Sequence, residues 1–346
     1  MNRSKIEWCD HTWNPITGCW HGCPYCYAQK MAVRFSGDVR LNLMAKEDYS
    51  VVKAADGIGR LYELDAPMMN ETGNILVYPF GFEPTYHRYR MDMPDKLKMG
   101  NNIFVGAMAD IFGEWVPDRW IEEIFTACRK HPIHNYLFLT KNPGRYERIE
   151  AAGMLPVDKN MWYGSTLTRP ENKCFISNGH NTFWSIEPIH APFEIWKKDK
   201  FSPDWIIIGA ETGRRREKII PRKEWIEDIV GRCSDSGIPV FMKDSLLPVM
   251  GESGMRREFP KQLQHSEISP KMEKRLFGIC SECKAKMKKS DMIVLLARSR
   301  RGEQPKQFGF MCNTCFQKFC HNSGLDVPEL AGLDESIMIG AGDGNE

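Results

Sequence analysis

Three cysteines lie within eight residues near the N-terminus, at Cys19, Cys23 and Cys26, with the aromatic Tyr25 directly before the third. Their spacing is C-x3-C-x2-C. Three closely spaced thiolates can bind three irons of a cubane [4Fe–4S] cluster and leave the fourth iron open. An open iron is a site for chemistry, whereas a cluster closed by four cysteines mostly transfers electrons. The loop therefore indicates a redox enzyme.

The spacing argues against two other metal sites without excluding them. Ferredoxin-type clusters use four cysteines with different spacings, and zinc sites prefer C-x2-C units with a second pair nearby. Cys9 could still supply a fourth ligand and make the site structural.

Four more cysteines form two C-x2-C pairs with 28 residues between them: Cys280 and Cys283, then Cys312 and Cys315. Four thiolates suit tetrahedral Zn²⁺, and a second Fe–S cluster is the alternative. A module of about 45 residues has too little core to fold alone. A structural metal would therefore supply much of its stability.

Basic residues gather between these pairs. Residues 298–306 read Arg-Ser-Arg-Arg-Gly-Glu-Gln-Pro-Lys, and residues 284–289 add four lysines. Such a loop suits phosphate contacts, which predicts DNA, RNA or a nucleotide as partner. The alternative is a solvated charged surface.

Composition sets wider limits. A chain of 346 residues suffices for one large domain and an appendage, and a net charge of +2 favours no class of partner. No apolar run reaches the length of a membrane span, and the first residues lack the pattern of a signal peptide. We therefore expect a cytoplasmic protein that makes no membrane contact and uses its clustered cysteines for metal rather than disulfides.

Short apolar runs alternate with amphipathic stretches over the first 250 residues. Strands are expected at 13–17, 75–78, 103–107, 136–139, 161–164, 182–186, 205–208 and 240–242, with helices over 28–35, 117–130 and 222–234. Continuous apolar strands alternating with helices predict a parallel α/β sheet. About eight such units fit a full or partial (β/α) barrel.

The domain organisation follows from shifts in composition. Residues 1–250 form the barrel, interrupted at about 37–74 by a polar insertion expected to be a lid or a partner-facing loop. Residues 251–275 are expected to be a linker and residues 276–321 the cysteine module. The acidic, glycine-rich tail over 322–346 is expected to be disordered.

Polar residues follow the expected strands, where a parallel barrel places its active site. They include Glu83, Asp110, Thr140, Lys141, Ser165, Glu187, Glu211 and Lys243. The set as a whole favours a polar ligand, although any one of these residues could simply begin a loop.

The cysteine loop resembles the signature of the radical S-adenosylmethionine (SAM) superfamily. The resemblance implies that Cys19, Cys23 and Cys26 bind a [4Fe–4S] cluster whose open iron is chelated by SAM. One electron then cleaves SAM to methionine and a 5′-deoxyadenosyl radical, which abstracts hydrogen from a substrate. It also implies that Tyr25 lies near the adenine and that a reductant such as flavodoxin or ferredoxin supplies the electron.

A second stretch, Phe80-Gly81-Phe82-Glu83-Pro84, resembles the Gly-Gly-Glu-Pro element that holds the SAM amino group in that superfamily. Phe82 replaces the second glycine, so the match is partial. Gly81 and Glu83 are the implied SAM contacts, Glu83 through a charge-assisted hydrogen bond.

Further stretches resemble a phage-associated family of unknown function over residues 8–247. They are Trp13–Cys19, Phe104–Phe112, Leu137–Pro143, Ser185–Pro188 and Ile207–Thr212. This family is similar to radical SAM proteins. Ser165 from the set above, and Glu187, Glu211 and Lys243 at recurring family positions, are candidate contacts for SAM or substrate.

Three functions remain open at this point. The first is a radical SAM enzyme acting on nucleic acid or a nucleotide. The second is a radical SAM enzyme acting on a peptide or small metabolite, with the cysteine module as a protein-docking unit. The third is a zinc-ribbon binding protein whose N-terminal cluster is structural or redox-sensing.

Overall fold

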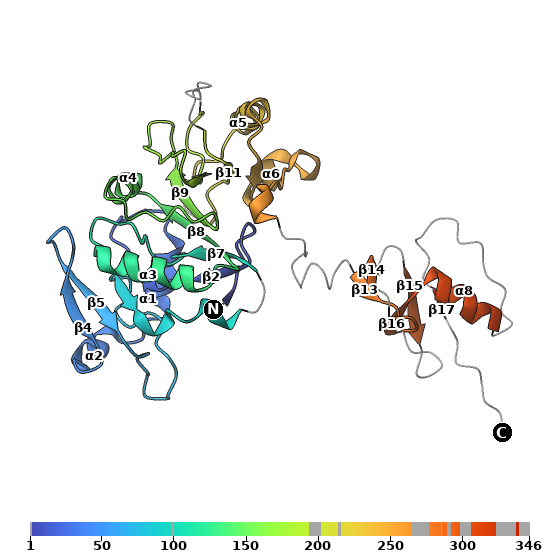
Figure 1. Ribbon diagram of the computed structural model, residues 1–346, viewed down its shortest axis with the longest axis horizontal. Coiled ribbons are helices and arrows are strands. Elements are labelled where there is room, and N and C mark those ends of the chain that lie inside the picture. Colours follow the sequence, from blue (N-terminus) through green and yellow to red (C-terminus); the bar gives the residue numbers. More distant parts are fainter. Residues whose placement is uncertain are drawn as a thin grey trace. The chain divides into compact units, whose positions relative to one another are not determined.

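The computed structural model describes residues 2–97, 100–193, 202–213, 216–264, 277–284, 286–288, 292–297, 306–322 and 337–338. The chain divides into two units, residues 1–264 and 265–346, which we describe separately (Figure 1). Most of the predicted basic loop and acidic tail, part of the linker, and Arg214 and Arg215 lie outside the described residues.

A parallel half-barrel forms the centre of the first unit. Its sheet has the order β1-β2-β7-β8-β9-β10-β11-β12. The strands are β1 (Asn2–Arg3), β2 (His11–Trp13), β7 (Asn102–Val105), β8 (Asn135–Thr140), β9 (Met161–Leu167), β10 (Asn181–Ile186), β11 (Trp205–Ile208) and β12 (Val240–Met242). Only β1 is antiparallel to its neighbour, and the other seven run parallel. The predicted α/β class is therefore confirmed, and the barrel is partial.

The sequence placed six of these strands correctly, β7 to β12, because they are apolar runs buried on both faces. The expected strand over 75–78 is wrong. Ile75 there makes only an isolated bridge with Met69, and its side chain is 52% exposed. The expected strand over 13–17 is two strands, β2 and β3 (Ile16–Thr17), which belong to different sheets.

Three helices cover the outer face of the half-barrel. They are α3 (Asp118–Lys130), α4 (Pro143–Ala151) and α5 (Lys223–Ser236), and Arg145 of α4 donates to Asp118 at the start of α3. Buried α3 side chains such as Trp120 and Phe125 pack in one cluster with Val105 and Phe138 of the strands. The amphipathic patterns of the sequence predicted α3 and α5.

Residues from the beginning and the end of the first unit pack on the concave face of the sheet. Trp8 packs against Phe104 with ring centroids 4.8 Å apart and against Trp205 at 6.2 Å. Phe259 packs on Trp205 from the other end of the unit. These rings form one buried cluster with Leu137, Trp162 and Phe183, so this face of the sheet is part of the core of the first unit.

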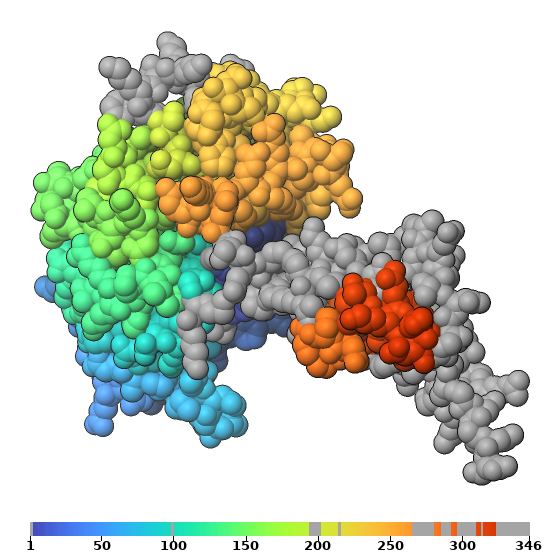
Figure 2. Space-filling model, turned by 45° about the vertical axis from the view of Figure 1, so that its right-hand side comes forward, coloured from blue at the N-terminus to red at the C-terminus, as the bar shows by residue number. Residues whose placement is uncertain are grey.

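The expected insertion is a folded part of the first unit. It supplies α2 (Val39–Met44) and a hairpin of β4 (Ser50–Lys53) and β5 (Arg60–Leu64). With β3 and β6 (Thr85–His87) the hairpin makes a four-stranded sheet of order β3-β6-β5-β4. Its light-blue residues lie at the surface of the first unit (Figure 2).

The smaller elements of the first unit are α1 (Tyr27–Arg34), α6 (Leu247–Met250) and the 3-10 helices Arg88–Arg90, Pro94–Lys96, Asp244–Leu246, Glu252–Gly254 and Lys261–Leu263. The second unit contains β13 (Phe277–Ile279), β14 (Lys286–Lys288), β15 (Met292–Ala297), β16 (Lys306–Cys312), α8 (Asn313–Asn322) and β17 (Ile337–Met338). Among the described helices, none has the length and apolar character needed to cross a bilayer.

One buried histidine should make the first unit sensitive to acid. Burial, reinforced by the nearby Arg90 cation, holds the pKa of His87 well below its ordinary value. Its two ring nitrogens face the hydroxyls of Thr17 at 2.8 Å and Tyr89 at 3.3 Å, which suit a neutral imidazole. In the unfolded chain the ring takes up a proton below about pH 6.5, so stability is present above that pH and falls as the pH is lowered.

We predict that, between pH 6.5 and 5.5, the free energy of unfolding falls by about 1 kcal/mol less in His87→Gln than in the unmodified chain, because the unfolded ring goes from half to about nine-tenths protonated over that interval. All ten tryptophans lie in the first unit, so denaturant unfolding followed by tryptophan fluorescence reports on that unit. Equal slopes for the two proteins would show that His87 can be protonated in the folded state.

Candidate functional site

The cysteine loop lies at the carboxyl edge of the half-barrel. Gly18 begins the loop and donates its N–H to the carbonyl of Met108, which follows β7. Cys19 donates its N–H to the carbonyl of Phe82 at 3.1 Å. The loop is therefore held between the end of the barrel sheet and the turn over residues 80–83.

The turn and the loop approach so closely that only glycine fits at position 18. Gly18 has φ +87°, and a Cβ built there would lie 2.3 Å from the carbonyl oxygen of Glu83. Gly22, in the same loop, also has a positive φ, +65°, but has nothing within 4 Å. The structure thus brings together the two stretches that the sequence singled out, the cysteine loop and Gly81-Phe82-Glu83.

The three thiols of the loop are partly exposed and accept backbone hydrogen bonds. Burial raises the pKa of Cys19 to about 12, although the N–H of His21 donates to its sulfur. Burial also raises the pKa of Cys23, against the lowering effect of Lys141. The sulfur of Cys26 accepts the N–H of Gln29 at 3.4 Å and so caps the first turn of α1.

Cys9 lies apart from this arrangement. Its thiol donates to the hydroxyl of Ser4 at 3.2 Å, and its side chain packs with Trp8 and Phe104 on the concave face. Burial raises its pKa to about 12. These contacts are those of a small buried core residue.

Asp110 joins the loop to the sheet. Its carboxylate accepts the hydroxyl of Thr140 at 2.8 Å and the N–H groups of Phe112 and Lys141 at 3.0 and 2.9 Å. The same carboxylate lies 2.7 Å from Nε2 of His21 in the cysteine loop. Because Asp110 is 5% exposed, these four contacts fix the loop against the ends of β7 and β8.

Lys141 also belongs to this site. It follows an expected strand in the sequence but is not among the candidate contacts for SAM or substrate named above. Its ammonium lies 3.2 Å from the hydroxyl of Tyr25 and 5.2 Å from the centre of that ring. The ring of Tyr25 in turn packs edge-on against His190, which follows β10. The position of Lys141 directly after a strand was the available signal, and its reach to the loop depends on the fold.

The three predicted residues at the far strands form two ion pairs, Glu187 with Lys243 and Glu211 with His190. Lys243 donates to Glu187. Gly209 lies close to both side chains, because a Cβ built on it would be 3.1 Å from Oε1 of Glu187 and 3.2 Å from Cδ of Lys243. Glu211 is buried, with Oε2 3.7 Å from Nε2 of His190. Through His190 and Tyr25 this second pair is continuous with the cysteine loop.

Glu83 and Ser165, the two remaining candidates, differ in burial and in partner. The carboxylate of Glu83 is exposed and accepts the indole N–H of Trp20, inside the cysteine loop, at 2.9 Å. Ser165 is fully buried, and its hydroxyl accepts the N–H of Phe175 at 2.9 Å. The hydroxyl of Ser165 therefore anchors the loop after β9, while its backbone lies beside Thr140 of β8 in the sheet.

The other four clustered cysteines lie together in the second unit. The sulfurs of Cys280, Cys283, Cys312 and Cys315 all lie within 4.8 Å of one another. Burial raises the pKa of Cys280, but the N–H groups of Cys312, Cys283 and Glu282 outweigh it and lower the pKa to about 6. This four-cysteine group can hold a metal ion.

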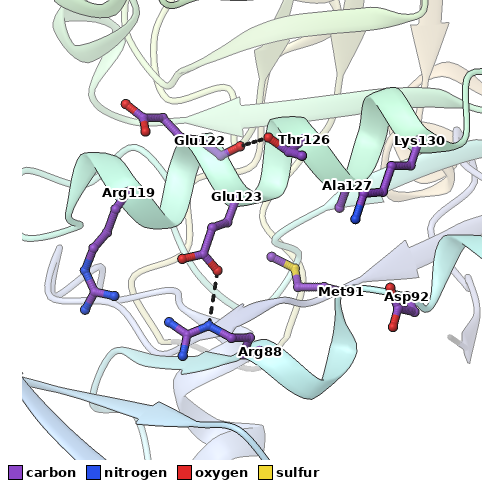
Figure 3. A pocket seen from close by; sticks show the side chains of 9 residues that line it. All are labelled: Arg88, Met91, Asp92, Arg119, Glu122, Glu123, Thr126, Ala127 and Lys130. Atoms are coloured by element: carbon purple, nitrogen blue, oxygen red, sulfur yellow. Dashed lines mark hydrogen bonds and ion pairs between the residues drawn. The ribbon is translucent and has the colours of Figure 1, made fainter.

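One cavity of the first unit has no cysteine in its lining. It measures about 460 Å³, and Figure 3 shows the carboxylate of Glu123 directed at Arg88 within it. Its lining is Arg88, Met91, Asp92, Arg119, Glu122, Glu123, Thr126, Ala127 and Lys130. Three cations face three carboxylates there, which gives no net charge for a ligand to recognise.

Fold and site together define a class: a parallel α/β half-barrel with a three-cysteine loop at its carboxyl edge, followed by a four-cysteine module. Residues 3–252 match a family described as proteins of unknown function, DUF5131. The match covers more than half of the chain, so the chain belongs to this family. Neither the curated proteins nor the solved structures contain a match. Radical SAM membership and a phage association remain predictions.

The close contact at Gly18 can be tested against Gly22. We predict that Gly18→Ala lowers the free energy of unfolding by more than about 2 kcal/mol, because strain at positive φ adds to overlap with the Glu83 carbonyl. Gly22→Ala should cost about 1 kcal/mol, from strain alone. Denaturant unfolding of both variants measures the difference, and equal losses would rule out the close approach.

Proposed function

We propose that this protein is a radical SAM enzyme that binds a [4Fe–4S] cluster through Cys19, Cys23 and Cys26 and acts on a nucleic acid or nucleotide. The observation that carries the proposal is the placement of three thiols, and no fourth among the described cysteines, on one loop at the carboxyl edge of a parallel half-barrel. When bound, the cluster would supply one electron to cleave SAM and generate the radical that abstracts hydrogen.

The donor set fits such a cluster. Three partly exposed sulfurs leave one iron for an external ligand, and Cys9, the nearest other cysteine in the sequence, is committed to Ser4 and the core. Backbone N–H groups already point at the sulfurs of Cys19 and Cys26. Such N–H···S contacts are among the interactions that tune protein-bound clusters.

The surrounding residues would bind and orient the ligand. Asp110 fixes the loop through His21, and Lys141 presents a cation beside Tyr25. Glu83 would offer a carboxylate to the SAM amino group, at the cost of its hydrogen bond to Trp20. The Glu187–Lys243 and His190–Glu211 pairs would line the side facing the substrate.

We assign zinc to the four-cysteine module. Sγ of Cys283 and Sγ of Cys312 lie 3.8 Å apart, which is the separation of two sulfurs bound tetrahedrally to one Zn²⁺ at about 2.3 Å. A cubane cluster places each cysteine on a different iron and needs wider separations. The module would then present the basic residues of its loop to a phosphate backbone.

Anaerobic reconstitution tests the enzyme. We predict that the full chain binds four irons and four sulfides at the N-terminal loop and, reduced with dithionite, converts SAM to 5′-deoxyadenosine. Cys23→Ala should abolish both. Cys174→Ala, at an isolated and partly buried cysteine, should change neither, which makes it the matched control.

Two results would contradict the proposal. Zinc alone in the purified chain would remove the enzyme class, and a full cluster without SAM cleavage would favour a structural or redox-sensing role. Retention of DNA or RNA that weakens as salt rises would support the nucleic-acid substrate, and its absence would favour a peptide or metabolite.

The zinc assignment has its own test. We predict one zinc per chain, lost in Cys312→Ser and kept in Cys320→Ser, because Cys320 is buried in the module core but lies outside the four-sulfur group. Loss of the ion should unfold the module, which limited proteolysis of the second unit would detect. Iron and sulfide in place of zinc would show a second cluster.

A further inference from the structure

Exposed apolar side chains are concentrated in one stretch of the first unit. Of the fifteen large apolar side chains exposed among its described residues, eleven fall between residues 27 and 77. They include Met31 at 43%, Phe35 at 50% and Met44 at 75%. Single exposed apolar residues are ordinary, whereas exposed apolar residues that lie together on one element mark an interaction surface.

Helix α1, which begins directly after Cys26, carries three of these exposed side chains, and a fourth is its C-cap Phe35. Only Ala28 and Ala32 of the helix are buried, and they pack against Tyr78 and Met108. Tyr27, Met31 and Phe35 recur every fourth residue and therefore form an exposed apolar stripe beside that buried side. We call this stripe, together with Lys30 and Arg34, the α1 face.

The α1 face is positively charged. Lys30 and Arg34 are exposed, lie one turn apart and flank the apolar stripe, and Arg34 stacks over Phe35 at 5.3 Å. Residues 26–37 contain no carboxylate. Within the described part of the chain neither cation makes an ion pair, so the face suits an acidic partner with an apolar centre.

The position of the face indicates what such a partner would do. Cys26, a proposed cluster ligand, is the N-cap of α1 and directly precedes Tyr27. The hydroxyl of Tyr27 donates to the carbonyl of Ala107 at 2.6 Å, which holds the ring against the end of β7. A protein seated on the α1 face would thus lie one residue from a cluster ligand.

We propose that the α1 face is the docking surface for an acidic electron-carrier protein that reduces the cluster. In this step the carrier is oxidised by one electron and the cluster is reduced by one, with no bond made or broken. The inference rests on the proposed function for its chemistry, whereas the docking itself is measured by direct binding.

The test uses the full chain and purified flavodoxin as the acidic carrier. Charge reversal at Lys30→Glu/Arg34→Glu should weaken flavodoxin binding at least 10-fold by calorimetry at low salt, and Met31→Ala should also weaken it. The matched controls are Lys130→Glu/Lys159→Glu and Val157→Ala, exposed residues before β8 and β9 at the opposite edge of the sheet, and they should bind normally.

A second readout separates docking from catalysis. Flavodoxin-driven bleaching of cluster absorbance should slow at least 10-fold in the charge-reversal variant, while dithionite reduction and dithionite-driven SAM cleavage stay unchanged. Failure of SAM cleavage with dithionite would refute the enzyme but leave the binding result standing.

Three outcomes would overturn the docking proposal. The first is normal flavodoxin affinity in the charge-reversal variant. The second is a dimer in sedimentation velocity that Met31→Ala dissociates, which would make the face a contact between copies of this chain. The third is binding to anionic lipid vesicles that the same variants abolish, which would make it a membrane contact.

Discussion

The contact on which the site depends is the approach of the Phe82–Glu83 peptide to Gly18. A backbone without a Cβ, at φ +87°, lets the turn over residues 80–83 lie against the start of the cysteine loop. The carbonyl of Phe82 then receives the N–H of Cys19, and the side chain of Glu83 meets Trp20 inside the loop. Two stretches more than 60 residues apart in sequence thereby become one surface.

The half-barrel gives this surface a rigid support. Trp8 and Phe259 pack on Phe104 and Trp205 of the strands, so this face of the sheet is buried by a fixed apolar cluster. Asp110, at the end of β7, uses this fixed position to hold both His21 of the loop and the backbone of Lys141. A buried carboxylate with four partners is costly to rearrange, so Asp110 keeps the cysteine loop in one position against the sheet.

Much of the framework could be predicted from the sequence, because strands buried on both faces leave uninterrupted apolar runs, as β7 to β12 do. The stretch over 75–78 has the same composition but no neighbouring strand to pair with, and Ile75 and Val77 point to solvent. Pairing is a property of the whole fold and leaves no local signal. For the same reason the sheet made by β4, β5 and β6 could not be predicted from a polar segment.

The candidate site residues also fall into two groups, those that local spacing predicts and those that only the fold identifies. Cys19, Cys23 and Cys26 are set by local spacing, and the structure keeps them together on one loop. The polar residues near the strand ends could be told apart only in three dimensions, since Ser165 lies inside β9 and bonds Phe175, whereas Lys141 directly follows β8 and reaches the loop. The two lysines at the carboxyl edge of the sheet also differ. The ammonium of Lys243 is paired with Glu187, whereas the described hydrogen bond of the Lys141 ammonium goes to the hydroxyl of Tyr25. Of these two described lysines, the one without a carboxylate partner therefore lies beside the cysteine loop, and the one at the far strands is neutralised.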